Sequence, residues 1–287
     1  MIDLSTVSAV YPGVTVGLPF DQYLQLPGES ASALKKMMVS PLNYKWAKEH
    51  KDTGTRAKNQ GTAAHAAILE PHRMKTDFIL WTGKTRAGKA WDLFKEAAGD
   101  RQILNETEWA EVVAMHDSVR SNPLAMKYLR DGVAEVTLQW TDPHTGIAHH
   151  ARVDWVTVVD GRLVFVDLKT TRDASYRRFC ADADKLGYHI QFGLYVDGGF
   201  YIFGETPLFV VIAVENKAPY DCAVYNVPDE VLQQGHDEYL RYEEQIAACR
   251  ESGFWPGRST CEMELTLPSW AIENDETDLS DLELVTE

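Results

Sequence analysis

The sequence predicts an α/β protein in which helices flank a mixed central β-sheet. Helical patterns occupy much of the first 130 residues, and a period-two alternation of apolar residues begins at residue 133. A helix, an apolar strand and a long helix then follow, an order typical of one α/β domain. Since no repeat or linker interrupts the chain, we expect an irregular lead-in at 1–29, a domain at 30–270 and an acidic tail at 271–287.

The helices in the first half are predicted from caps and helix formers. Ser30 or Ser32 can cap a helix that stops near Pro41. Residues 61–70 are rich in strong helix formers and end at Pro71. Further helical patterns cover residues 89–98 and 106–130.

The second half begins with three strand-like segments. They cover residues 134–140, 149–159 and 162–170, separated by TDPHTG and by Asp160-Gly161. A helix around 186–197, an apolar strand at 207–215 and a long helix at 228–251 complete the chain. The predicted sheet is therefore built mainly from the second half.

The composition is that of an ordinary globular protein, with 45% hydrophobic and 25% charged residues. No run approaches the roughly 20 apolar residues that a bilayer requires, and the N-terminus lacks the features of a secretory signal. We therefore expect a cytoplasmic protein without a membrane partner. The four cysteines form no CxxC pair, so we expect no iron–sulfur cluster.

The net charge of −15 restricts how this chain could bind a polyanion. Residues 271–287 hold seven acidic and no basic residues, so the rest carries about −15 + 7 = −8. Such a tail is typical of a solvated chain end. Any contact with DNA must then be local, through a basic groove or within a ring-shaped assembly.

The Asp160-Gly161 pair is the strongest hairpin signal in the sequence. A two-residue turn pairs Val159 with Arg162, so the numbers of facing residues sum to 321. By this arithmetic Asp154 faces Asp167, and Lys169 projects from the same side of the sheet. The hairpin is thus expected to bring two carboxylates and an amine together.

This arrangement favours a metal site that acts on phosphodiesters. Facing like charges destabilise a sheet unless a cation lies between them, and oxygen ligands suit Mg²⁺ or Mn²⁺. Lys169 could orient, and even deprotonate, the attacking water. The alternative is a surface hairpin with ordinary charges, but apolar flanks on both strands favour a buried one.

Glu135 would be a third carboxylate at this site. If TDPHTG closes a hairpin, Glu135 falls within about a residue of the position opposite Asp154. Three carboxylates could hold two metal ions, which clamp the attacking and leaving oxygens of a phosphodiester. The register of this longer loop stays open.

These residues also carry a family resemblance. Asp154 followed by DLK at 167–169 resembles the PD-(D/E)xK nuclease signature, with Val153 in place of the usual proline. GTAAH at 61–65 resembles the GxxxH helix of exonuclease-type members, and QFGLY at 191–195 their QxxxY helix. With SPLNYKW, VDLKTT and VENKAPY, the chain is similar from about 30 to 270 to RecE-type exonucleases (exodeoxyribonuclease VIII).

The resemblance implies a restriction-endonuclease-like core and a 5′→3′ exonuclease on linear double-stranded DNA that leaves 3′ overhangs for recombination. It also implies a single-strand annealing partner, a ring-shaped homo-oligomer, and a bacterial or phage-infected cell. The site residues that it implies are the metal ligands Glu135, Asp154, Asp167 and the Leu168 carbonyl, Lys169 at the nucleophile, His65 beside the metals, and Gln191 and Tyr195 on the DNA side.

Residues 83–90 nearly match the phosphate loop GxxxxGK[ST]. Ala90 replaces the hydroxyl that would bind magnesium, so we expect no nucleotide cofactor. Lys84, Arg86 and Lys89 instead give a basic loop suited to DNA phosphates, or simply a solvated loop. Lys35, Lys36 and Arg86 are candidates for binding a 5′-phosphate.

Two other functions stay open from the sequence. A restriction-type or structure-specific endonuclease could use the same core and would cut a closed circle. A recombination protein that binds DNA without catalysis would need the basic residues but no carboxylate cluster.

Overall fold

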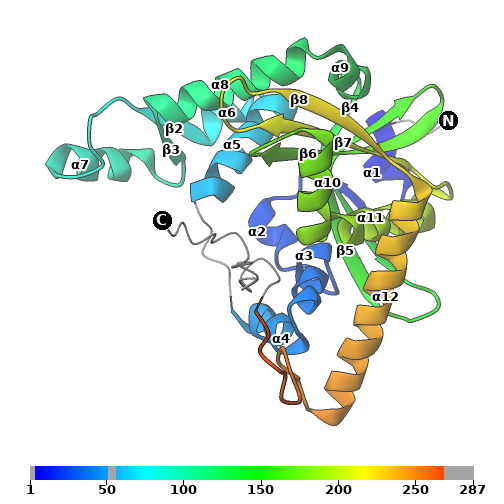
Figure 1. The fold of residues 1–287 in the computed structure, drawn as a ribbon. Helices are drawn as coiled ribbons and strands as arrows, with labels where there is room; N and C mark the ends of the chain where they lie inside the picture. Colours follow the sequence, from blue (N-terminus) through cyan, green and yellow to red (C-terminus); the bar gives the residue numbers. More distant parts are fainter. Residues whose placement is uncertain (1–3, 51–55, 268–287) are drawn as a thin grey trace, which may run out of the picture.

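A six-stranded sheet forms the centre of the protein in a computed structural model that describes residues 4–50 and 56–267 (Figure 1). The strand order is β1-β4-β5-β6-β7-β8. β6 and β7 run parallel and the other neighbouring pairs run antiparallel, so the predicted mixed sheet is confirmed. The strands are β1 (Val14–Val16), β4 (Gly132–Thr141), β5 (Ala148–Val159), β6 (Arg162–Thr171), β7 (Leu208–Glu215) and β8 (Cys222–Val227).

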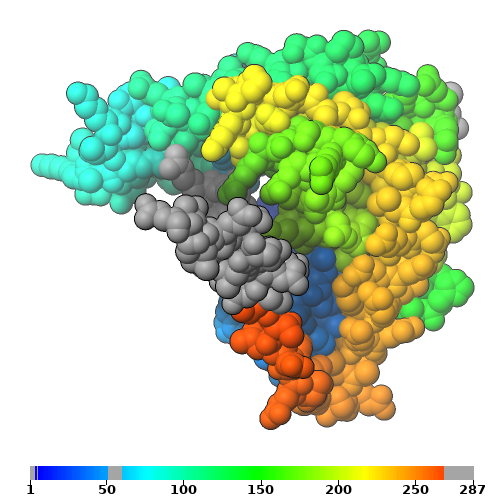
Figure 2. All heavy atoms as spheres, viewed as in Figure 1, coloured from blue at the N-terminus to red at the C-terminus, as the bar shows by residue number. Residues whose placement is uncertain are grey.

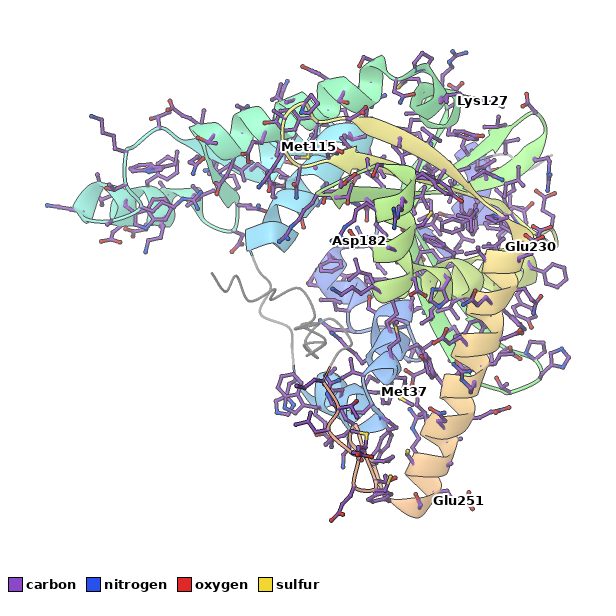
Figure 3. The ribbon with its side chains drawn as sticks, viewed as in Figure 1. Met37, Met115, Lys127, Asp182, Glu230 and Glu251 are labelled. Carbon is purple, nitrogen blue, oxygen red and sulfur yellow. The ribbon has the colours of Figure 1, made fainter. Side chains whose placement is uncertain are left out.

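Helices cover both faces of this sheet (Figure 1). One face packs on α11 (Tyr188–Phe203) and the 24-residue α12 (Asp229–Ser252). The other packs on α5 (Arg56–Leu69), α8 (Glu106–Ser121) and α9 (Pro123–Leu129). Met37 and Met115, labelled in Figure 3, belong to the two separate apolar cores that result.

The remaining elements are short or lie at the edges. They are η1 (Leu4–Thr6), α1 (Val7–Val10), α2 (Phe20–Tyr23), α3 (Ala31–Leu34), η2 (Lys35–Met38), α4 (Pro41–Glu49), α6 (Arg73–Thr76), α7 (Lys89–Ala98) and α10 (Tyr176–Lys185). Strands β2 (Phe78–Trp81) and β3 (Gln102–Asn105) form a separate parallel pair. With α7 they project from the left of the molecule in Figures 1 and 2.

The structure adds detail to the expectations from the sequence. Within residues 4–29, where an irregular lead-in was expected, Val14–Val16 forms an edge strand beside β4. The predicted helix at 106–130 is two helices, because Asn122 caps a new helix at Pro123. The helical segment that follows Ser30 does end before Pro41, as expected, and Ser40 then caps a new helix, α4, with Pro41 in its first turn.

No helix within the described ranges combines the length and apolar character that crossing a membrane would require. The acidic segment 271–287 lies outside the described residues, so its expected structure is not tested.

Candidate active site

The β5–β6 hairpin turns at Asp160-Gly161 as predicted. Both residues have positive φ, 52° and 78°, as a two-residue type I′ turn requires. Val159 pairs with Arg162, and the register continues to Trp155 opposite Val166. The ladder stops there, one position before Asp154 and Asp167 would pair.

Beyond this last pair, the side chain of Asp154, rather than the backbone of β5, forms the next hydrogen bond to β6. Its Oδ2 accepts a hydrogen bond from the backbone N–H of Leu168 at 2.8 Å. Burial and the nearby Asp167 carboxylate raise the pKa of Asp154 to about 7. Burial and the neighbouring carboxylate both disfavour the ionised form of Asp154, an effect that a cation bound beside it would oppose.

Asp167 is held from two sides. Its side chain is 2% exposed, and its Oδ2 forms an ion pair with Lys169 Nζ. Its Oδ1 accepts a hydrogen bond from Gln191 Nε2 at 2.7 Å. Asp167 and Lys169 stand two residues apart on β6 and project from the same face, as the strand period predicts.

Glu135 lies opposite Asp154, in agreement with the expectation from the sequence. Ala134 pairs with Trp155 and Val136 with Val153, which leaves Glu135 facing Asp154 between them. Glu135 has a φ of 54°, a left-handed conformation that is uncommon outside glycine. Its carboxylate forms an ion pair with Arg152.

The side-chain alternation of both strands slips by one residue at this place. Val133 and Val136 of β4 contact the same apolar core, although residues an odd number apart should face opposite sides. Val153 and Val156 of β5 show the same irregularity. Such bulges re-aim side chains next to active sites, and here the slips flank Glu135 and Asp154.

His65 reaches the cluster from α5. Its Nδ1 lies 3.6 Å from Asp154 Oδ2. One ligand atom each from His65, Glu135 and Asp154 all lie within 4.8 Å of one another. Burial lowers the pKa of His65, which favours the neutral imidazole that can bind a metal. A hydrogen bond to the backbone of Leu168 raises that pKa, though by less than burial lowers it.

The two α11 residues occupy different environments. Gln191 is in the site, because its amide oxygen also lies 3.5 Å from Lys169 Nζ. Tyr195 is 8% exposed and packs in the core beside Phe209, with ring centroids 6.4 Å apart. Burial raises the pKa of Tyr195, with smaller contributions from Asp167 and Asp154, so Tyr195 lies near the cluster; that it lines the DNA side stays a prediction.

The basic loop lies away from these residues. Lys84 and Arg86 precede α7 and Lys89 begins it, in the β2–β3–α7 unit at the left of Figure 1. Arg86 is paired with Glu108 and also donates to the Ile103 carbonyl. The structure therefore separates the loop from the β4–β5–β6 cluster.

Lys35 and Arg152 also join the site; from the sequence, Lys35 was only a candidate for binding a 5′-phosphate, and Arg152 was not predicted. Lys35 Nζ lies 3.5 Å from Gln191 Oε1, the atom that Lys169 also approaches. Burial and the nearby Lys169 lower the pKa of Lys35 to about 8. Arg152 could have been found, because it stands two residues before Asp154 on one strand face. The contact of Lys35 with Gln191 could not be predicted, since 156 residues separate them.

Comparisons with known proteins agree with this fold. The family profile described as "PDDEXK-like domain of unknown function (DUF3799)" matches residues 30–265. No protein of curated function matches the sequence. A solved structure titled "Putative exonuclease" from Eubacterium rectale superposes with a TM-score of 0.59 at 15% identity, over 88% of this chain and 95% of that one.

Two other solved structures are less similar. SSO0001 has a TM-score of 0.27 at 12% identity, over 73% of this chain and 100% of that one. VC1899 from Vibrio cholerae has a TM-score of 0.23 at 12% identity, over 83% of this chain and 58% of that one.

Proposed function

Since the chain belongs to the PDDEXK-like family DUF3799, within the PD-(D/E)xK nuclease superfamily, we propose that it is a metal-dependent 5′→3′ exodeoxyribonuclease on linear double-stranded DNA. The observation that carries the nuclease part is the convergence of Asp154, Asp167 and Lys169 on one buried patch. The polarity and the preference for DNA ends rest on the resemblance to RecE-type exonucleases.

The residues present fit a divalent metal. Asp154 and Asp167 lie close together, and burial and the Asp167 carboxylate raise the pKa of Asp154, an effect that a bound divalent cation would oppose. Carboxylates from Glu135, Asp154 and Asp167 supply the oxygen ligands that Mg²⁺ and Mn²⁺ prefer, and the imidazole of His65 lies beside them. A bound metal would polarise the phosphodiester and activate water.

The chain's own residues would divide the rest of the chemistry. Burial lowers the pKa of Lys169, but Asp167 and Asp154 raise it by more, so its side chain stays an ammonium group. Held by Asp167 and Gln191, this group would orient the attacking water and stabilise the negative charge that develops on the phosphate. The hydrogen bond from Leu168 N–H would hold Asp154 Oδ2, the oxygen that lies 3.6 Å from His65 Nδ1, in place. Arg152 would fix the carboxylate of Glu135 against the sheet.

The proposal extends to partners. We expect a 3′ overhang as product, an annealing protein that receives it, and a ring-shaped homo-oligomer that encloses the duplex. A ring would concentrate its few basic groups around DNA despite a net charge of −15. Light scattering would test this part, because a monomer at micromolar concentration would exclude the ring.

The direct test uses linear, nicked and closed circular duplexes with either the 5′ or the 3′ ends labelled, in magnesium and in EDTA. Loss of 5′ label from linear DNA alone, stopped by EDTA, is the expected result. Cutting of the closed circle would instead support an endonuclease with the same core. Binding without any cleavage would favour a recombination protein that only binds DNA.

A further inference from the structure

Helix α2 presents an exposed aromatic ring beside the carboxylate cluster. Phe20 is 52% exposed, and it stacks on Tyr23 with ring centroids 6.1 Å apart and planes inclined by 19°. The guanidinium carbon of Arg152 lies 5.5 Å from the Phe20 centroid and 5.7 Å from that of Tyr23. The aromatic pair is therefore fixed to β5 by a cation–π contact.

The same guanidinium joins Phe20 to the cluster. Arg152 forms an ion pair with Glu135, whose oxygen lies within 4.8 Å of ligand atoms of His65 and Asp154. A single guanidinium group thus separates the exposed ring from the carboxylates. A nucleotide whose phosphate lay at the cluster would have its base within reach of this ring.

We propose that Phe20 forms a nucleobase-stacking site, which holds a base of the strand whose phosphate lies at the carboxylate cluster. This inference rests on the proposed nuclease function and adds a binding site to it. A base is the occupant that fits, because the phosphate fixes its position and every base has a flat π-face that stacks on an aromatic ring.

The exposure of α2 supports a binding role over a packing role. Tyr23, on the same helix, is 9% exposed and anchors α2 to the sheet. Phe20 and Leu24 are 52% and 65% exposed, and side chains four residues apart share a helix face. The helix therefore buries one aromatic side chain and leaves an apolar edge open next to the site.

Photo-crosslinking tests the site directly. Duplexes would carry 5-iododeoxyuridine at one of the three terminal positions of either strand, and calcium would replace magnesium so that bound DNA is not cleaved. We expect one position to crosslink to Phe20, identified by mass spectrometry of the peptide. Phe20→Ala should remove this crosslink and weaken binding by about 5- to 100-fold, whereas Phe20→Trp should bind nearly as the wild type.

Phe200→Ala is the matched control, because Phe200 is 51% exposed but lies on α11 nine residues beyond Gln191. It should leave both crosslinking and affinity unchanged. Failure of the wild type to crosslink at Phe20, or equal affinity of Phe20→Ala and wild type, would overturn the stacking site while leaving the nuclease proposal intact. Equal losses in Phe20→Ala and Phe20→Trp, with normal thermal melting, would also overturn it and point to a disturbed Arg152–Glu135 pair. A wild type that binds no DNA would overturn both proposals.

Discussion

Lys169 is proposed to act on the attacking water, whereas the neighbouring carboxylates are proposed to bind the metal. It forms an ion pair with Asp167 and approaches Gln191, but it contributes no metal ligand. We predict that Lys169→Met lowers the cleavage rate by about 10²- to 10³-fold, the usual cost of removing one group that stabilises charge in the transition state, while DNA binding in calcium persists. Lys127→Met is the control, since Lys127 is exposed on α9 (Figure 3). Normal turnover of Lys169→Met would exclude Lys169 from catalysis.

The buried carboxyl group of Glu243 is expected to make the stability of the protein depend on pH. It is buried on α12, 3.5 Å from the equally buried His149, and burial raises its pKa to about 8. The folded protein therefore holds a proton on Glu243 that the unfolded chain releases above its ordinary pKa of 4.5. Stability from this group is complete below pH 4.5 and is lost as the pH rises to about 8.

We predict that Glu243→Gln removes this loss. Burial also lowers the pKa of His149 to about 4, which opposes the effect below pH 6.5. The unfolding free energies of Glu243→Gln and wild type should therefore be measured in urea at pH 6.5 and at pH 8. The difference, variant minus wild type, should be larger at pH 8 than at pH 6.5. Glu251→Gln, at the exposed end of the same helix (Figure 3), should show no such trend. A constant difference for Glu243→Gln would mean that Glu243 is not protonated in the fold.

At the scale of elements, the α11–α12 contact depends on two glycines. A Cβ on Gly235 would meet the His189 carbonyl oxygen at 1.9 Å, and one on Gly193 would meet the backbone of His236 at 2.5 Å. Backbones this close leave no room for a side chain. We predict that Gly235→Ala lowers the unfolding free energy by about 1–3 kcal/mol or more, as overpacking does.

The matched control is Gly257→Ala, where the nearest atom would be 3.9 Å from the new Cβ. Thermal and urea unfolding of both variants would separate the two sites. Equal stability of Gly235→Ala and wild type would mean that α11 and α12 do not pack as described.

The sequence could predict elements whose signals are local. The Asp160-Gly161 turn set the β5–β6 register, and Gly88 and Gly99 bound a helix at Lys89–Ala98 as expected. Strand β8 was missed, because its residues are only partly buried and show no clean alternation. Edge strand β1 was missed because three residues carry too little pattern.

The site could be predicted where it depends on strand geometry. Asp154, Asp167 and Lys169 follow from one turn and a period of two, and Glu135 follows, to within about a residue, from the longer loop TDPHTG. The bulge at Glu135 could not be predicted. Glutamate ordinarily avoids positive φ, and the surrounding tertiary structure imposes the φ of 54° on Glu135. Lys35 and Phe20 enter through elements whose positions depend on packing across the whole fold.

For the whole molecule, the acidic segment 271–287 contributes seven of the net negative charges. We predict that a chain ending at residue 270 folds with an unchanged melting temperature, because segments of this composition do not bury a core. Circular dichroism would measure this. A truncated chain that failed to fold would show that the segment is part of the domain.

The central claim is that Asp167 holds a metal required for hydrolysis. The most direct measurement compares wild type and Asp167→Asn for cleavage of end-labelled linear duplex DNA in magnesium, with binding of the same DNA followed in parallel. We predict that the variant binds DNA within a few-fold of wild type, keeps its melting temperature and releases no label. Cleavage by Asp167→Asn at the wild-type rate would contradict the assignment and place the chemistry elsewhere in the chain.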